Sequence, residues 1–276
     1  MKKFQLKLIY IVTLLILCVT LTSCSTIHKV LKDTRDSGNE NNSNVSLNTM
    51  TNQNSDSSKA NPSIPSSVSS KTDDCEPSEK LIKLLQKAAL TTNDLKKENC
   101  QQLITVTGTG NVAEICFFEL KNNIWQEAES TGCQGHLGKN GINKNKIEGD
   151  NCTPFGLYSI GSAFYIEQKP ATGLNCFKIT DESYWVDDSN SKFYNQYVIG
   201  EDEKDWKSAE HMIDYSGYKY GFTINYNTEQ TKGAGSAIFF HIGKSYTAGC
   251  VATYEENVLK YLSLLDSDKN PHILLQ

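Results

Sequence analysis

The chain has 276 residues, with 27 basic and 32 acidic side chains and a formal net charge of −5 at pH 7. No cluster of lysine or arginine accompanies this balance, so we expect no nucleic-acid partner. The length suffices for one domain with a sizeable core once the N-terminal segments are set aside.

The first 23 residues have the pattern of a lipoprotein signal peptide. Lysines at positions 2, 3 and 7 precede an apolar run over 8–21, which is shorter than the ~20 residues of a membrane-spanning helix. The run ends in Leu-Thr-Ser-Cys, which resembles a bacterial lipobox and implies cleavage before Cys24 and lipidation of its thiol. The alternative is an ordinary signal peptide that contains a cysteine. We expect an extracytoplasmic chain, lipid-anchored to the cell membrane and facing the cell wall.

Residues 24–74 are expected to form a flexible tether. The segment is dominated by Ser, Asn and Thr and carries no aromatic residue. Such a composition cannot bury enough apolar surface to offset the loss of chain entropy. About 200 residues then remain for folded structure, and removal of the three signal lysines leaves 24 basic residues against 32 acidic ones.

Seven cysteines follow the lipobox, and they suggest six in disulfides plus one reactive thiol. They are Cys75, Cys100, Cys116, Cys133, Cys152, Cys176 and Cys250. The sequence does not give their pairing, and an anaerobic habitat would keep all of them reduced. None is spaced as Cys-x-x-Cys, so we expect no metal site.

Residues 75–102 are predicted to be a helical N-terminal segment. Its helix lies in 77–90, with Ser78 as the N-cap. The apolar face of this helix comprises Leu81, Leu84, Leu85 and Ala88.

Residues 103–276 are predicted to be a mainly β domain with a few short helices. β-Branched and aromatic runs alternate with Gly, Asn and Asp turns, and they lie at 103–108, 113–120, 124–130, 156–164, 175–180, 218–227 and 236–242. A helix is expected over 253–266, started by a capping box of Thr253 and Glu256. A last strand over 270–276 completes the pattern.

The stretch AIFFHIGKSYTAGCVAT, residues 237–253, places a histidine and a cysteine on either side of a short loop. A thiol becomes a good nucleophile when an imidazole removes its proton, and the imidazole can then protonate a leaving amine. His241 and Cys250 are therefore the candidate base and nucleophile. Gly249 permits a tight or positive-φ backbone, and the Gly249 and Cys250 N–H groups could face a developing oxyanion. The alternative is a buried cysteine that only packs.

This stretch resembles the end of the L,D-transpeptidase (YkuD-like) catalytic domain. In that family a strand ends in His, and a variable loop leads to Ser or Thr, one further residue, Gly and Cys, followed by a helix and a last strand. A second landmark, within 135–164, resembles the family's Gly-Asp and its Thr-Pro-x-Gly-x-Tyr/Phe-x-Ile strand. The matching positions are Gly149, Asp150, Thr153, Pro154, Gly156, Tyr158 and Ile160.

The resemblance implies a β-sandwich of the L,D-transpeptidase type and a cysteine-dependent acyltransferase without a cofactor. The family's Cys attacks the L,D peptide bond of a peptidoglycan stem tetrapeptide and forms a thioester. An amine of a neighbouring stem, commonly on diaminopimelate, resolves the thioester into a 3→3 cross-link. Water instead gives an L,D-carboxypeptidase, and a non-catalytic wall-binding lipoprotein is a third possibility. By position, Cys250 is the nucleophile, His241 the base and Thr247 the family's Ser/Thr.

The match departs from the family's common pattern at three points. Ala248 stands where the family often has His, Ala252 stands where it often has Arg, and the spacing from His241 to Cys250 is short. The missing Arg bears on how a substrate carboxylate is held, so donor preference is open.

Three further residues are candidates for substrate binding: Tyr158, Trp185 and His211. Trp185 belongs to an aromatic and acidic segment, 183–198, which could instead be a loop that packs in the core. For His211 a structural or surface role is the alternative. Oligomeric state does not follow from the sequence.

Overall fold

The computed structural model describes residues 78–128 and 130–276. The predicted signal peptide (1–23), lipidated Cys24, tether (24–74) and Cys75 lie outside these residues and stay predictions. Within the described part, no helix is long and apolar enough to cross a membrane.

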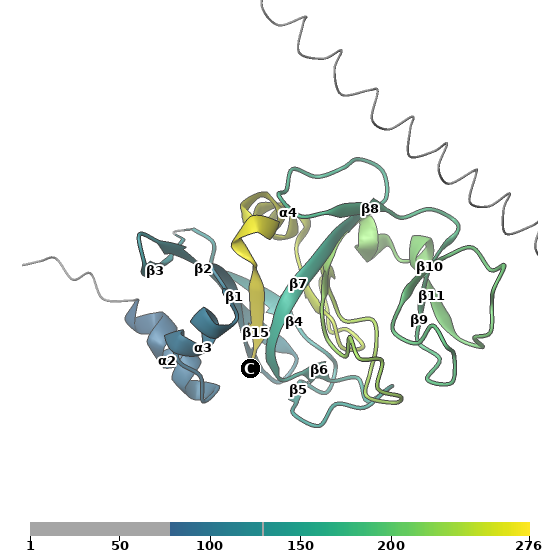
Figure 1. Ribbon diagram of the computed structural model, residues 1–276, viewed down its shortest axis with the longest axis horizontal. Coiled ribbons are helices and arrows are strands. Elements are labelled where there is room, and N and C mark those ends of the chain that lie inside the picture. Colours follow the sequence, from purple (N-terminus) through teal and green to yellow (C-terminus); the bar gives the residue numbers. More distant parts are fainter. Residues whose placement is uncertain (1–77, 129) are drawn as a thin grey trace, which may run out of the picture. The chain divides into compact units, whose positions relative to one another are not determined.

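The main sheet closes on itself. Its strands run in the order β1-β15-β7-β12-β13-β14-β4-β2-β3, and β1 also pairs with β2 (Figure 1). Their bounds are β1 Gln102–Thr109, β2 Val112–Lys121, β3 Ile124–Glu127, β4 Cys133–His136, β7 Gly156–Tyr165, β12 Tyr220–Ile224, β13 Phe239–Ile242, β14 Val251–Thr253 and β15 His272–Leu275. The parallel pair β1–β15 joins the first and the last strand of the described residues, and β13 and β14 form a second parallel pair.

Several shorter strands pair with this closed sheet or form small sheets of their own. β8 (Cys176–Lys178) pairs with β7, and β5 (Ile142–Asn143) pairs with β6 (Thr153–Pro154). A separate three-stranded sheet has the order β10-β9-β11, formed by Tyr197–Ile199, Ser183–Val186 and Ala209–His211. It lies on the side of β7 away from the N-terminal helices (Figure 1).

Two N-terminal helices, α2 (Glu79–Lys87) and α3 (Thr92–Lys97), cover the outer side of β1 and β2 (Figure 1). Leu81, Leu85 and Leu95 are almost fully buried against Leu103, Phe118 and Trp125. Burying a Leu side chain contributes roughly 1.5–3 kcal/mol, which explains why these short helices are held in place.

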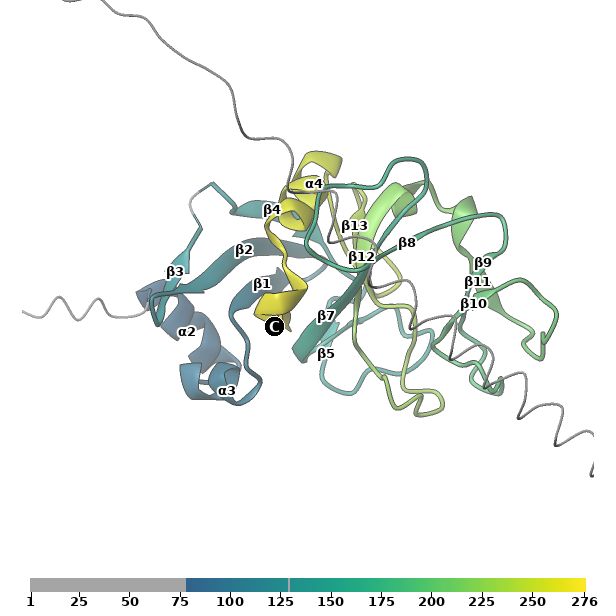
Figure 2. The same cartoon turned by 45° about the horizontal axis from the view of Figure 1, so that its top comes forward.

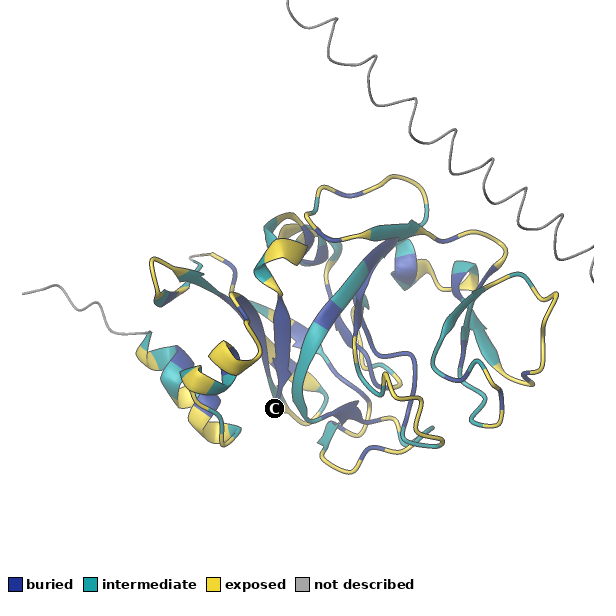
Figure 3. Ribbon diagram, viewed as in Figure 1, coloured by how far each residue is buried: buried dark blue, intermediate teal, exposed yellow. Residues whose placement is uncertain are grey.

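The third helix, α4 (Glu255–Leu264), lies against β12 and β13 (Figure 2). Its residues Val258, Tyr261 and Leu262 enter the main core together with Phe222 and Phe240 of the sheet. Figure 3 shows this core as buried strand segments, whereas the connecting loops carry most of the exposed residues. The core fixes the ends of β13 and β14, between which the candidate loop runs.

The predicted fold class is confirmed: the domain is mainly β, with short helices, one of which follows the Cys250 loop. The helix predicted within 77–90 is confirmed, and its four apolar residues all pack into one cluster. The helix α3 and the short strands β4, β9, β10, β11 and β14 were not predicted.

The capping box predicted for the last helix is wrong. Thr253 is the end of β14, and its hydroxyl donates to the Gln134 carbonyl at 2.7 Å, so Tyr254 takes the N-cap position without a side-chain cap. Thr253 is thus part of a paired strand, although its local sequence pattern favours the start of a helix.

The expected disulfides are also absent from the described residues, in which all six cysteines are free thiols. Cys100 and Cys116 are buried in the cluster under α2 and α3, and the Cys116 sulfur also accepts a hydrogen bond from Lys80 Nζ at 3.1 Å.

Candidate active site

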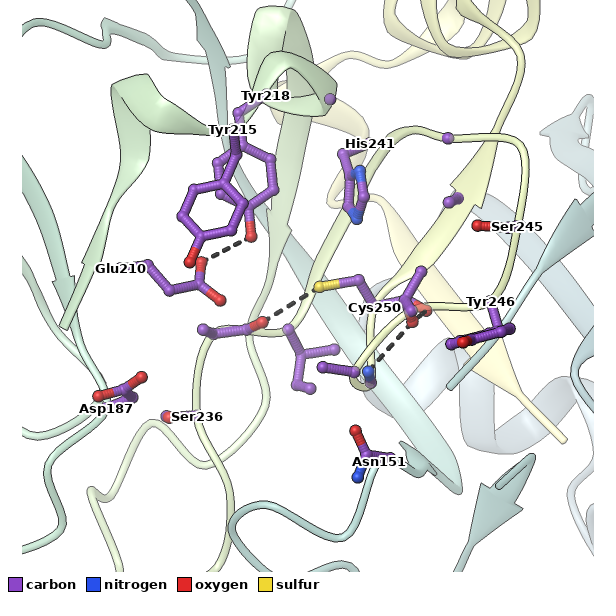
Figure 4. Close-up of a pocket in the computed structure, with 18 of the residues that line it drawn as sticks. Asn151, Asp187, Glu210, Tyr215, Tyr218, Ser236, His241, Ser245, Tyr246 and Cys250 are labelled. Carbon is purple, nitrogen blue, oxygen red and sulfur yellow. Dashed lines mark hydrogen bonds between the residues drawn. The ribbon is translucent and has the colours of Figure 1, made fainter. Parts of the chain in front are cut away.

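His241 lies on β13, and Cys250 lies just before the adjacent strand β14, two residues ahead of the partner of His241. β13 and β14 are parallel, with Phe240 opposite Val251 and His241 opposite Ala252. Cys250 directly precedes β14, and the loop from 243 to 249 leads from the end of β13 back to the start of β14. Both side chains line a cavity of about 590 Å³ (Figure 4).

The imidazole of His241 is oriented by the backbone. Its Nδ1 lies 2.8 Å from the carbonyl oxygen of Ile242, an acceptor that fixes the proton on Nδ1. Nε2 is then unprotonated, and the ring points toward the Cys250 thiol (Figure 4). Burial lowers the pKa of His241 to about 4, so the ring is neutral and available as a base at neutral pH.

The thiol of Cys250 is buried and held by two backbone groups of the neighbouring strand region. It donates to the Ala237 carbonyl at 3.2 Å and accepts from the Phe239 N–H at 3.3 Å. Burial, reinforced by the negative charge of Glu210, raises the pKa of Cys250 to about 12. The resting pair is therefore a neutral thiol beside a neutral imidazole.

Thr247 shapes the turn before Cys250. Its hydroxyl donates to the Cys250 carbonyl at 2.7 Å and accepts from the Gly249 N–H at 3.0 Å. The Gly249 N–H is thus occupied and does not face the cavity freely, contrary to the expected oxyanion role. The Cys250 N–H makes no hydrogen bond within residues 78–128 and 130–276.

Position 249 needs glycine because neighbouring atoms approach its backbone closely. Its φ is not positive. A Cβ there would lie 3.0 Å from the Cys152 carbonyl oxygen, 3.1 Å from Ile238 and 3.5 Å from Lys146 Nζ. The two sequence landmarks therefore meet in space at this glycine.

A second contact joins the landmarks at the same turn. Thr153 is fully buried, accepts the Gly138 N–H at 2.8 Å and lies 3.5 Å from the Cys250 carbonyl. Beside it, Lys146 and Asp150 form a buried ion pair at 2.9 Å. Burial acts to raise the pKa of Asp150, but hydrogen bonds from Lys146 and two backbone N–H groups lower it overall.

An acidic wall faces the cysteine across the cavity. It is formed by Glu148, Asp187 and Glu210, all of which line the cavity. Glu210 Oε2 accepts the Tyr218 hydroxyl at 2.6 Å, and the Tyr218 ring packs edge-on against the His241 ring at 5.1 Å. Burial, with the charges of Asp187 and Glu148, raises the pKa of Glu210 to about 7 although the Tyr218 hydrogen bond lowers it.

Glu148 and Glu210 were missed from the sequence as candidates, whereas Asp187 belongs to the acidic segment 183–198 that the sequence analysis considered. The segment around His211 was singled out, but residues alternate along β11, so Glu210 faces the cavity and His211 faces the other side.

The three candidate substrate-binding residues do not line this cavity. His211 contacts the Asp214 carboxylate at 2.8 Å and the Asp181 carbonyl at 2.7 Å, and it stacks on Tyr184. These contacts agree with the alternative of a structural role for His211.

Tyr158 and Trp185 also lie elsewhere. Tyr158 donates to the Phe155 carbonyl at 2.7 Å and packs on Tyr226. Trp185 donates to Asn195 at 3.0 Å and packs on Phe239, behind the site. The aromatic segment is thus a packing element that supports the cavity wall.

Both positions that depart from the family pattern, Ala248 and Ala252, line the cavity. Lys244, in the loop between His241 and Cys250, lines it too. In the part of the chain that the structure describes, no three His, Cys, Asp or Glu residues are placed to hold a metal ion.

The closed β fold thus carries a cavity that a cysteine and a histidine line together. The L,D-transpeptidase catalytic domain matches residues 104–273, and the chain belongs to this family. Its members are cysteine-dependent L,D-transpeptidases that act on peptidoglycan stem peptides. No curated protein matches the chain.

Proposed function

We propose that this protein is a peptidoglycan L,D-transpeptidase that forms 3→3 cross-links through a thioester on Cys250. The observation that carries the proposal is the orientation of His241, whose Nδ1 is held by the Ile242 carbonyl while the ring points toward the Cys250 thiol. A merely packed cysteine has no need of a neighbouring imidazole held in one tautomer.

The first half-reaction begins with transfer of the Cys250 proton to His241 Nε2. The thiolate attacks the carbonyl of the L,D peptide bond in a stem tetrapeptide, and the Cys250 N–H donates to the developing oxyanion. His241 returns the proton to the leaving D-amino acid as the C–N bond breaks. A neutral thiol beside a neutral imidazole suits this order of steps, because the base is already unprotonated at neutral pH.

The second half-reaction decides between the candidate activities. Attack by an amine of a second stem gives a cross-link, whereas attack by water gives the L,D-carboxypeptidase. The acidic wall opposite Cys250 favours a cationic acceptor and therefore the transpeptidase.

Two further parts of the proposal concern location. A lipid on Cys24 would hold the enzyme at the outer face of the cell membrane, and the tether over 24–74 would let it reach the wall. A non-catalytic wall-binding lipoprotein remains the rival of another class.

Intact-protein mass spectrometry tests the proposal. The purified protein is mixed with a disaccharide-tetrapeptide, alongside Cys250→Ala and the control Cys176→Ala, which removes a half-buried thiol of β8. We expect a thioester adduct on the wild type and on Cys176→Ala, absent from Cys250→Ala, that converts to a cross-linked dimer.

Other results point to the rivals. An adduct that decays only to tripeptide supports the carboxypeptidase. No adduct on the folded wild type, with retained binding to the wall, supports the binding protein.

A further inference from the structure

Glu210 has one carboxylate oxygen fixed and the other free. Oε2 accepts the Tyr218 hydroxyl at 2.6 Å, and this is the one hydrogen bond that the carboxylate makes within residues 78–128 and 130–276. The residue lines the same cavity as Cys250 and His241 (Figure 4). A free carboxylate oxygen in a reaction cavity is available to a donor that the substrate brings.

Tyr218 fixes the place of this carboxylate relative to the reacting groups. Its side chain is buried, its ring packs on those of His241 and Phe239 at 5.1 and 5.4 Å, and its hydroxyl holds Glu210. Glu210 is therefore positioned on the wall facing the thiol and not on a loose surface chain.

The wall carries negative charge without a cation of its own. Asp187 and Glu148 line it beside Glu210, and Glu148 is held by the hydroxyls of Tyr194 and Ser236. The other titratable groups that line the cavity are Lys146, Asp214, Tyr215, Tyr218, His241, Lys244, Tyr246 and Cys250. The cavity's two lysines lie outside this wall: Lys146 is paired with Asp150 at 2.9 Å, and Lys244 belongs to the loop between His241 and Cys250. This charge pattern fits a substrate ammonium group.

We propose that Glu210 binds the ammonium group of the acceptor and takes a proton from it, so that the acyl-enzyme reacts with an amine in preference to water. This inference rests on the proposed function. It names a residue for the second half-reaction and explains how one fold could favour cross-linking over hydrolysis.

The proton count of the reaction requires such a group. An acceptor enters as R–NH3+, and one N–H bond breaks as its proton passes to Glu210, leaving R–NH2. The nitrogen lone pair forms the new C–N bond and the C–S bond breaks, while a second proton passes through His241 to the Cys250 sulfur. The amide keeps the third hydrogen, and Glu210 releases its proton to solvent when the product leaves. Water needs only the transfer through His241.

The environment of Glu210 suits this task. Burial and the neighbouring carboxylates raise the pKa of Glu210 to about 7, which makes its carboxylate a stronger base than an ordinary glutamate. At neutral pH a substantial fraction remains ionised and able to accept the proton.

The test compares two acceptors on the acyl-enzyme formed from a stem tetrapeptide. The first is a diamino-acid stem, cationic at pH 7, and the second is methoxyamine, which is neutral at pH 7 and needs no prior deprotonation. In Glu210→Gln we expect aminolysis by the cationic acceptor to fall at least about 100-fold, the usual scale of general-base catalysis, and aminolysis by methoxyamine to fall far less. The charge-matched control is Glu229→Gln, which changes an exposed glutamate 19 residues after Glu210.

The wild type offers a second test that does not depend on a variant folding. With Glu210 as the base, the rate constant for the cationic acceptor levels off above about pH 7. Without it, the rate constant keeps rising about tenfold per pH unit toward the amine pKa of about 10.

Two results overturn the inference: an equal loss with both acceptors, or a pH profile that rises without a plateau. Release of the D-amino acid reports the first half-reaction separately. If the wild type releases none, the proposed function fails and this assignment fails with it.

Discussion

The hydroxyl of Thr247 lies 2.7 Å from the Cys250 carbonyl oxygen, to which it donates, and it accepts the Gly249 N–H at 3.0 Å. One side chain thus closes the turn that presents the thiol. Because the Gly249 N–H is used in this turn, the Cys250 N–H is the backbone donor left for an oxyanion.

Removing this hydroxyl should loosen the turn. Thr247→Ala loses two hydrogen bonds worth about 1 kcal/mol each, and we expect acylation by a stem tetrapeptide to slow by about tenfold or more. Thr247→Ser keeps the hydroxyl and should retain most of the rate. The rate of adduct formation by mass spectrometry measures both variants. Equal rates for Ala and Ser would show that the turn does not depend on this side chain.

The low pKa of His241 predicts the acid side of the pH profile. The imidazole acts as a base only when unprotonated, and burial lowers its pKa to about 4. We expect kcat/KM for acylation to hold down to about pH 5 and to halve near pH 4, well below the ordinary value of 6.5. His241→Ala should abolish acylation. A midpoint at pH 6–7 would contradict a buried neutral base.

The sequence allowed the prediction of elements whose signal is local. The helix α2 was predicted from its apolar stripe, with Leu81 and Leu85 buried, and the long strands β1, β2 and β7 were predicted from their runs of β-branched and aromatic residues. Short strands such as β14, with three residues, exist only through their partners and carry no such period.

The residues of the candidate site likewise differ in whether a local pattern could identify them. His241, Cys250 and Thr247 lie close together in the sequence, and a motif could identify them. Glu210 reaches the cavity through the pairing of β11 with β9, and Tyr218 reaches it through the packing of the 3-10 turn Ser216–Lys219 against β13. No local pattern indicates either arrangement. Disulfides were expected from a count alone, whereas the six cysteines of the described residues are free thiols.

The buried pair of Lys146 and Asp150 should matter for stability. Their side chains are only 3% and 11% exposed, so Asp150→Asn leaves a lysine charge buried without its partner. We expect a loss of about 3 kcal/mol in the free energy of unfolding, measured by urea denaturation at pH 7. Lys146→Met with Asp150→Asn should be less destabilised than Asp150→Asn alone.

The pH dependence of this pair has a defined sign. The pKa of Asp150 lies below its unfolded value of 3.8, so its contribution is present above pH 3.8 and is lost as the pH falls through the lower folded value. An unfolding free energy of Asp150→Asn equal to that of the wild type at pH 7 would contradict the pairing.

Glu210 should destabilise the folded protein at high pH. Its folded pKa of about 7 exceeds the ordinary 4.5, so between these values the folded state binds more protons and stability falls as the pH rises. Glu210→Gln, which stays neutral, should therefore gain stability over the wild type at pH 8, by at most about 3 kcal/mol. Thermal unfolding at pH 5 and pH 8 measures this gain. A variant less stable than the wild type at pH 8 would argue that the carboxylate is well compensated.

Gly217 provides the last test, because it lies directly against the group that orients the base. A Cβ there would lie 2.5 Å from the Ile242 carbonyl oxygen and 3.1 Å from His241 Nδ1, the two atoms of the hydrogen bond that fixes the tautomer. Gly217→Ala must push this pair apart, and we expect acylation to slow by about tenfold or more with a stability loss of about 1–3 kcal/mol.

The matched control is Gly132→Ala, where an added Cβ meets no atom within 4 Å. It should acylate like the wild type. If Gly217→Ala acylates as fast as Gly132→Ala, the bond from His241 to the Ile242 carbonyl is not what prepares the base, and the orientation of the imidazole must come from its packing on Tyr218.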